Sequence, residues 1–171
     1  MSGATTAAWI ALGGNLGDRR EHLERAIAEL STTPGIRVIA VSSFVETEPV
    51  GGPRGQPRFL NAAASLETEL PARALLDTLH AIERAHGRDR AREVKNGPRT
   101  LDLDLLLYGD AHIDEPGLVV PHPRLEERTF VLLPLSEIAR GLVLPRCRSS
   151  VERRLAELTA RTAEARDAIA P

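Results

Sequence analysis

Cysteine is almost absent from this chain of 171 residues, since Cys147 is the only one. A single cysteine excludes an internal disulfide and a structural zinc site built from several thiolates. No window approaches the ~20 apolar residues that a membrane-spanning helix needs, and residues 1–8 lack the basic and apolar regions of a secretion signal. We therefore expect a cytoplasmic protein that has no membrane partner.

Lysine and aromatic residues are also scarce. Lys95 is the single lysine, so nearly all positive charge is carried by arginine, and aromatic residues make up 3% of the chain. The 22 basic and 24 acidic residues give a formal net charge of -2, which excludes a global field that would attract nucleic acid. We expect no nucleic-acid partner, and any binding of a polyanion has to be local.

The composition that remains is that of an ordinary globular protein, with 42% hydrophobic and 27% charged residues. A length of 171 residues predicts a single domain, which we expect to act as a monomer. Its core is expected over about residues 6–139 and a C-terminal helix over about 149–168. No internal repeat or interdomain linker is visible.

The hydrophobic pattern of the first two thirds predicts alternating strands and helices. Runs rich in apolar and β-branched residues predict four strands: 6–12, 36–47, 59–68 and 101–108. Apolar residues at helical spacing predict two helices between them: 18–33, with Asp18 as N-cap, and 71–87. The order βαββαβ is that of a ferredoxin-like α+β fold, with an antiparallel sheet, both helices on one face and the other face free for a site.

Further elements are predicted after this core. A hairpin is expected at 111–120, a helical region at 124–139, and a terminal helix that starts at Ser149. Two connections, 47–58 and 87–99, are too long for simple turns, and half of the first is glycine or proline. Loops of this length in a compact domain are often lids or binding loops, and we expect that role for both.

The most informative stretch is GPRTLDLDLLLYG, residues 97–109. Alternation along a strand predicts that leucines 101, 103, 105 and 107 face the core, while Asp102 and Asp104 share the other face with Leu106 and Tyr108. Two partly buried carboxylates repel each other and favour a cation between them. Mg²⁺ suits such a pair, because it takes one or two carboxylates and completes its shell with water and phosphate. A solvated strand face without a role is the alternative.

Positive charge is concentrated just before this strand. Residues 84–99 contain six basic and two acidic side chains. A cationic loop beside a carboxylate pair suits a metal-bound triphosphate, with the metal on the acids and the phosphate oxygens on the arginines. A solvated charged loop is the alternative.

The segment PHPRLEERTF, residues 121–130, offers further phosphate contacts in His122 and Arg128. Phe59 and Phe130 are two of very few aromatic residues and could enclose a flat ring, although the residues alone favour core packing. The turn at 13–18 matches neither a P-loop nor GxGxxG.

Five segments in a fixed order resemble one known family: ALGGNLGD, SSFVETEP, FLNAA, GPRTLDLDLLLYG and PHPRLEERTFVLLPL. From about Ile10 to Ile138 the chain resembles hydroxymethyl-dihydropterin pyrophosphokinase of folate biosynthesis. The resemblance implies a 2-amino-4-hydroxy-6-hydroxymethyldihydropteridine diphosphokinase, which transfers the diphosphate of ATP to the pterin hydroxymethyl group and releases AMP. It also implies a ferredoxin-like fold, mobile loops and two magnesium ions as cofactors.

The resemblance also implies a role for individual residues, carried over by motif. The metal ions would be held by Asp102 and Asp104. Catalytic roles would fall to these two and to Arg90, Arg92 and Arg99. ATP would be bound by Glu83, Arg92, Lys95, Arg99, His122 and Arg128. The pterin would be bound by Thr47, Val50, Phe59, Asn61 and Phe130.

One region departs from the family pattern. Lys95 and Asn96 stand where the family often has an arginine followed by an aromatic residue. The assignment of catalytic roles among Arg88, Arg90 and Arg92 is therefore open, and Arg90 and Arg92 are our choices. The alternatives to the enzyme are a noncatalytic ferredoxin-like RNA-binding module and a nucleotide sensor that binds without turnover.

Overall fold

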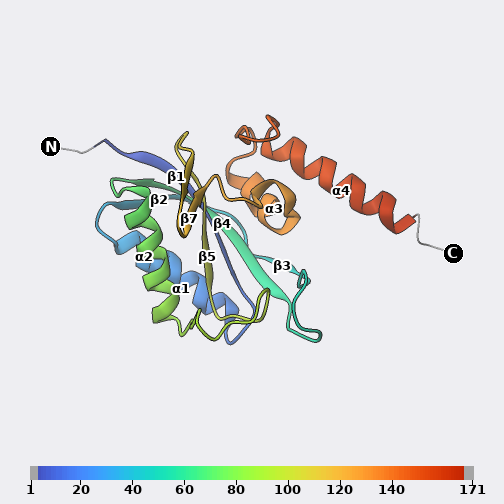
Figure 1. Ribbon diagram of the computed structural model, residues 1–171, viewed down its shortest axis with the longest axis horizontal. Helices are drawn as coiled ribbons and strands as arrows, with labels where there is room; N and C mark the ends of the chain where they lie inside the picture. The colour runs from blue at the N-terminus through green and yellow to red at the C-terminus, as the bar shows by residue number, and fades with distance from the viewer. Residues whose placement is uncertain (1–3, 168–171) are drawn as a thin grey trace.

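The computed structural model describes residues 4–167, which form a sheet with helices on both faces (Figure 1). The first part contains β1 (Thr6–Gly14), α1 (Arg19–Thr32), β2 (Ile36–Val41), β3 (Val45–Thr47), β4 (Phe59–Thr68), α2 (Ala72–Ala85) and β5 (Asp102–Tyr108). The second part contains β6 (Ile113–Glu115), β7 (Leu118–Val120), the 3-10 helix η1 (Leu125–Glu127), α3 (Thr129–Ile138) and α4 (Val151–Asp167). Residues 1–3 and 168–171, the ends of the expected domain, lie outside the described residues.

The main sheet has the strand order β2-β4-β1-β5, with β3 also paired to β4, and each pairing is antiparallel. This confirms the ferredoxin-like α+β fold and its βαββαβ order. The hairpin is confirmed as β6 and β7. No helix in the described part of the chain is both long and apolar enough to cross a membrane.

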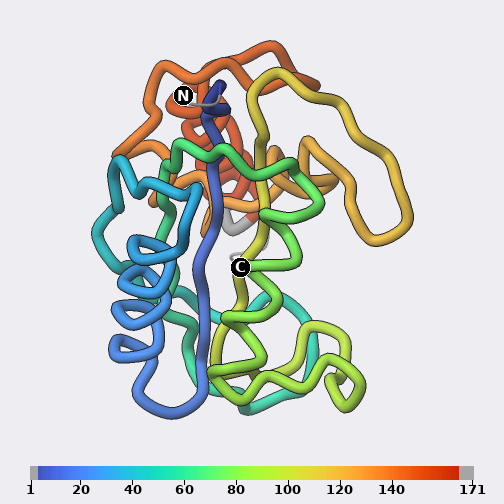
Figure 2. Tube along the Cα trace, turned by 90° about the vertical axis from the view of Figure 1, so that its left-hand side faces the viewer, coloured from blue at the N-terminus to red at the C-terminus, as the bar shows by residue number. Residues whose placement is uncertain are grey.

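Helices α1 and α2 cover the same face of the sheet (Figure 2). Their apolar faces, which include Leu23 and Leu79, pack on Ile10, Leu12 and Leu103 in one buried cluster. Burial of such leucines contributes roughly 1.5–3 kcal/mol each. The N-cap prediction for α1 is confirmed, because the Asp18 carboxylate accepts a hydrogen bond from the Glu21 N–H at 3.0 Å.

The opposite face is open only in part, which corrects the expectation of a free face. Helix α3 covers one end of it and α4 packs on α3 (Figure 1), so that Leu132 and Val151 join Leu106 of β5 in a second buried cluster. The rest of this face carries the cavity described below. The second cluster forms because the segment after β7 carries its own apolar residues, which are buried by packing against this face of the sheet.

The predicted strand 36–47 is wrong at its centre, because the structure divides it into β2 and β3. Ser42 lies between them, and its hydroxyl accepts the Ala63 N–H at 2.9 Å while its own N–H donates to the Ala63 carbonyl. A side-chain oxygen thus takes the place of a backbone carbonyl in the ladder, which interrupts the strand.

The predicted alternation along β5 is wrong at its C-terminal end. The pairing shifts by one residue between Trp9, opposite Leu107, and Ile10, opposite Leu105. This irregularity turns Leu107 toward the second cluster with Leu106, whereas Tyr108 packs against the first. Asp102 and Asp104 precede it and keep their alternation.

The terminal helix begins at Val151, two residues after the predicted start at Ser149. The hydroxyl that accepts from the first turn belongs to Ser150, which receives the Arg153 N–H at 3.2 Å, while the Ser149 hydroxyl has no partner among the described residues. Residue 168 of the predicted helix lies outside the described residues.

Candidate active site

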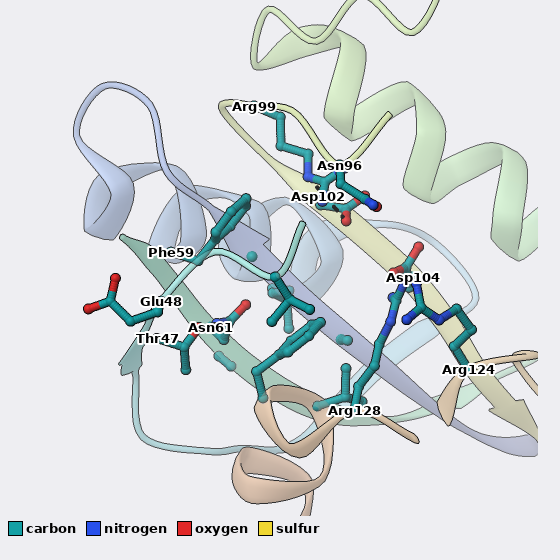
Figure 3. A pocket seen from close by; sticks show the side chains of 17 residues that line it. Thr47, Glu48, Phe59, Asn61, Asn96, Arg99, Asp102, Asp104, Arg124 and Arg128 are labelled. Atoms are coloured by element: carbon teal, nitrogen blue, oxygen red, sulfur yellow. Dashed lines mark hydrogen bonds and ion pairs between the residues drawn. The ribbon is translucent and has the colours of Figure 1, made fainter. Parts of the chain in front are cut away.

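An open cavity lies on the partly covered face of the sheet (Figure 3). Strand β5 contributes Asp102 and Asp104 on one side, and β4 contributes Phe59 and Asn61 on the other. The start of α3 and the turn before it add lining residues from a third direction: Arg124, Arg128, Phe130 and Val131. The cavity therefore joins an acidic, a basic and an aromatic surface.

The two aspartates have different surroundings. The Asp102 carboxylate accepts a hydrogen bond from Arg88 and lies 3.5 Å from Arg99 Nε. Burial opposes the ionisation of Asp102, but the Arg99 and Arg88 guanidiniums outweigh it and hold its pKa below the usual range. Asp104 has no arginine within ion-pair distance among the described residues, and His122 Nε2 lies 4.0 Å from it. Burial and then the negative charge of Asp102 raise the pKa of Asp104 to about 7.

A divalent cation fits this pair. Asp104 carries a charge that burial and Asp102 both disfavour, and a cation between the two carboxylates would relieve both effects. The described residues hold no group of three or more His, Cys, Asp or Glu side chains placed to bind a metal. Mg²⁺ tolerates such an incomplete protein shell, because water and substrate phosphate supply its other ligands.

Basic groups beside the aspartates have unused hydrogen-bond donors. Arg99 Nε is buried and has no hydrogen-bond partner among the described residues. His122 Nδ1 accepts the Arg124 N–H at 3.1 Å, so the ring hydrogen is on Nε2, the nitrogen that faces Asp104. Burial and then Arg128 lower the pKa of His122 to about 4, so the ring is a neutral donor. An anion in the cavity would satisfy these donors.

The aromatic side of the cavity contains all five residues that the resemblance assigned to the pterin: Thr47, Val50, Phe59, Asn61 and Phe130. Arg99 lies over the Phe59 ring at 5.4 Å and Arg128 over the Phe130 ring at 5.5 Å. The Asn61 amide donates to Thr47 Oγ1 at 2.6 Å, which orients its carbonyl oxygen as an acceptor. Two aromatic rings with an oriented amide are suited to a flat, polar heterocycle.

The two long loops meet at the cavity and each contributes lining residues, Val50 from one and Asn96 from the other. The Gln56 side-chain amide links them, since it donates to the Asn96 carbonyl at 3.0 Å and accepts from the Asn15 amide at 3.2 Å. Residues that lie 40 and 41 positions apart are thereby joined beside the cavity. The movement of these loops as lids stays a prediction.

Comparison with known proteins agrees with this geometry. Residues 9–140 match the family described as 7,8-dihydro-6-hydroxymethylpterin-pyrophosphokinase (HPPK). The chain belongs to the HPPK family. A Pseudomonas aeruginosa relative named 2-amino-4-hydroxy-6-hydroxymethyldihydropteridine pyrophosphokinase is 45% identical over 137 residues, which cover 80% of this chain and 83% of the relative. A Bacillus subtilis relative of the same name is 47% identical over 133 residues, which cover 78% of each.

Solved structures support the fold alone, because their sequence identity is low. A Plasmodium falciparum HPPK-DHPS with pterin and p-hydroxybenzoate aligns with a TM-score of 0.73 at 14% identity, over 95% of this chain. The present chain spans 45% of that longer protein. The expectation of a pyrophosphokinase of folate biosynthesis is confirmed by the family and its curated members, which give no support to a noncatalytic RNA-binding or sensing module.

Five residues that the HPPK resemblance implied do not line the cavity: Glu83, Arg90, Arg92, Lys95 and His122, although His122 Nε2 lies 4.0 Å from Asp104. Glu83 is buried behind β5, where it accepts the Leu103 N–H at 2.8 Å and pairs with Arg90 at 2.7 Å. Arg92 is 89% exposed and lies 3.3 Å from Asp89, and Lys95 is exposed. The loop that carries Arg90, Arg92 and Lys95 therefore directs these side chains away from the aspartates in this structure.

Three residues near the HPPK aspartates were missing from the sequence-based selection. Arg88, whose role was left open, contacts Asp102 directly, and Arg124 and Asn96 line the cavity. Arg124 lies between His122 and Arg128 in the sequence, and this proximity could have predicted that it lies near the same cavity. The position of Asn96 in the cavity could not be predicted from the sequence, because it depends on a left-handed backbone, φ 56°, and on the close approach of Gly52.

Gly14 fixes the position of Arg99 in this HPPK chain. A Cβ atom at Gly14 would clash with the backbone carbonyl of Thr100. The next residue, Asn15, donates its backbone N–H to the Arg99 carbonyl at 2.9 Å, and its side-chain oxygen accepts the Arg99 N–H at 2.9 Å. We predict that Gly14→Ala lowers the free energy of unfolding by about 1–3 kcal/mol, because backbone cannot move aside as a flexible side chain can.

Urea denaturation checks this prediction. Gly141→Ala is the matched control, since nothing lies within 4 Å of its added Cβ atom, and its stability is expected to stay close to wild type. Equal midpoints for the two variants would contradict the assigned role of Gly14.

Proposed function

We propose that this chain transfers the diphosphate of ATP to the hydroxymethyl group of hydroxymethyl-dihydropterin, giving AMP and the pterin diphosphate. The observation that carries the proposal is the single cavity in which an aromatic pocket adjoins two aspartates flanked by arginines. The pterin would lie between Phe59 and Phe130, with Asn61 and backbone groups of Thr47 and Val50 at its polar edge. Its hydroxymethyl group would then point toward the aspartates.

The triphosphate of ATP would lie along the basic side of the same cavity. Arg99, Arg128 and His122 present donors there. Glu83, Arg90, Arg92 and Lys95 lie outside the cavity, so the proposal requires the 87–99 loop to bring Arg90, Arg92 and Lys95 closer to ATP when it binds. Such closure is common in enzymes that must exclude water.

Asp102 and Asp104 would hold two magnesium ions. When bound, these ions would supply positive charge that offsets the negative charge of the triphosphate. The hydroxymethyl oxygen forms a bond to the β-phosphorus, the bond from that phosphorus to the AMP oxygen breaks, and the hydroxyl proton is released. Positioning and charge neutralisation dominate reactions of this type, so the arginines and the metal charge held by the aspartates, rather than a strong base, would carry the catalytic effect.

The decisive experiment follows AMP in a mixture of protein, magnesium, ATP and the reduced pterin alcohol. The proposal expects one AMP for each pterin diphosphate and no AMP when the pterin is omitted. Binding of ATP without pterin-dependent AMP would instead indicate a nucleotide sensor and would refute the enzyme.

A prediction about Phe59 tests the pterin pocket. Phe59→Leu is expected to raise the KM for the pterin about tenfold, because the ring contact, worth about 0.5–1.5 kcal/mol beyond the buried area, is lost, while the KM for ATP stays within about twofold. Phe44→Leu is the control, since Phe44 does not line the cavity and packs under Arg20 instead. Steady-state kinetics with each substrate varied in turn measures both constants, and equal pterin KM values for the two variants would contradict the pocket.

We also propose that the enzyme acts as a monomer in the cytoplasm, without nucleic-acid or membrane partners. Support comes from the sequence, whose formal net charge of -2 gives no global field for nucleic acid and which has no apolar run of membrane-spanning length. Light scattering during gel filtration is expected to give the mass of one chain, and a stable dimer would overturn this part of the proposal.

A further inference from the structure

Arg124 lies in the candidate active site without an assigned role. It lines the cavity together with Asp104 and Arg128 and reaches it from the turn that precedes α3 (Figure 3). Among the described residues its ion-pair contact is Glu127, whose Oε2 is 3.5 Å from Arg124 Nε. The Arg124 side chain is 48% exposed, and a pair of this kind at the surface contributes little. Most donors of its guanidinium are therefore free for a ligand.

The charge of Arg124 faces other positive charge. After burial, Arg124 is the main group that lowers the pKa of Arg128, so the two guanidiniums, which both line the cavity, repel each other. Arg99 also lines this cavity, and like charges held together in one cavity raise the free energy of the protein unless an anion lies between them. The planar guanidinium is suited to phosphate oxygens in two-point contacts.

The backbone around Arg124 is held by the C-terminal part of the chain. The Glu126 carboxylate accepts the N–H groups of Arg146 and Cys147 at 2.8 and 2.9 Å. Arg154 of α4 donates to the Glu126 carbonyl at 2.9 Å, and the Arg146 side chain donates to the Pro123 carbonyl at 2.9 Å. These anchors come from residues beyond position 140, where the family match ends.

Such anchoring favours ligand binding at Arg124. A segment that is already fixed loses little conformational entropy when a ligand binds. The anchored segment carries His122, Arg124 and Arg128 toward the same cavity, so its position determines where three potential donors lie. Several hydrogen bonds therefore hold the backbone around Arg124, although its guanidinium has no strong partner among the described residues.

We infer that Arg124 is a further phosphate-binding residue, which contacts the triphosphate of ATP beside Asp104. This inference rests on the proposed function, because it takes ATP as the ligand of the cavity. Losing one charge-assisted hydrogen bond is expected to weaken ATP binding by about tenfold or more.

The experiment measures the dissociation constants of Mg-ATP and of the pterin by calorimetry, each without the other substrate, so that no turnover occurs. For Arg124→Ala we expect an ATP constant about tenfold above wild type and an unchanged pterin constant. Arg124→Lys is expected to recover part of the loss, because it keeps the charge but not the planar fork. Arg140→Ala is the matched control for removing one arginine charge, since Arg140 does not line the cavity.

Each outcome decides the inference. An ATP constant for Arg124→Ala equal to that of Arg140→Ala overturns it, and so does an equal loss of ATP and pterin binding, which would indicate a general disturbance of the cavity. These binding results are independent of the AMP assay. A wild-type protein that binds ATP but forms no pterin-dependent AMP would refute the proposed reaction. The dissociation constants of Mg-ATP would still decide whether Arg124 binds phosphate.

Discussion

Asp104→Asn is expected to lower kcat at least ~10³-fold at saturating magnesium, which corresponds to a barrier increase of about 4 kcal/mol. The change keeps the size of the side chain and removes its negative charge. Asp104 has no arginine partner within ion-pair distance in the described structure, and its surroundings disfavour its charge. A protein retains such a carboxylate at a cost, and binding a cation during the reaction accounts for it. Stopped assays that quantify AMP measure the effect.

Two controls make this result specific. Asp114→Asn removes the same charge from the exposed hairpin and is expected to leave kcat unchanged. Addition of a chelator to wild-type protein is expected to abolish turnover, and excess magnesium should restore it. Near-normal turnover of the Asp104→Asn variant at saturating magnesium would remove Asp104 from the metal site. Asp102→Ala is expected to have an effect of similar size, but it also releases Arg88 and Arg99 from their partner and is harder to interpret.

Local patterns in the sequence were sufficient for the core of this fold. Strand and helix periodicity depend on near neighbours, so the βαββαβ order and the Asp18 cap could be predicted without distant contacts. The same alternation placed Asp102 and Asp104 together, because both precede the irregularity in β5. Beyond it the prediction failed, since the pairing shift depends on how β1 lies against β5, which no local pattern encodes.

The loops around the cavity show the same limit. Asn96 lines the cavity because Gly52 and Gln56, some 40 residues earlier, pack against its backbone. Arg88 contacts Asp102 because Glu83 and Glu93 hold it from two sides. Counting charges in residues 84–99 identified a basic segment, but it could not distinguish the arginine that turns inward, Arg88, from the one that points to solvent, Arg92.

Arg88 is also expected to contribute strongly to stability. Its side chain is 3% exposed and that of Glu83 is 1% exposed, with Arg88 Nη1 2.5 Å from Glu83 Oε1. Arg88 also donates to the Leu101 carbonyl at 3.3 Å and pairs with Glu93 at 2.6 Å. Arg88→Met keeps most of the buried volume but leaves the Glu83 carboxylate with only Arg90 as a cationic partner within ion-pair distance in the described structure.

Breaking a buried ion pair from one side costs about 3–5 kcal/mol, because the remaining charge stays buried. At roughly 2–4 °C per kcal/mol for a chain of this size, the Tm of Arg88→Met should fall by roughly 6–20 °C in differential scanning calorimetry. The double variant Arg88→Met/Glu83→Gln should regain most of this loss, since a neutral amide can still accept the Leu103 N–H through its oxygen. Arg92→Met, at a side chain that is 89% exposed, is the control and should melt close to wild type. If Arg88→Met melted with that control, the Glu83–Arg88 pair would have no stabilising role, and the position of Asp102 would have to be maintained by Arg99 alone.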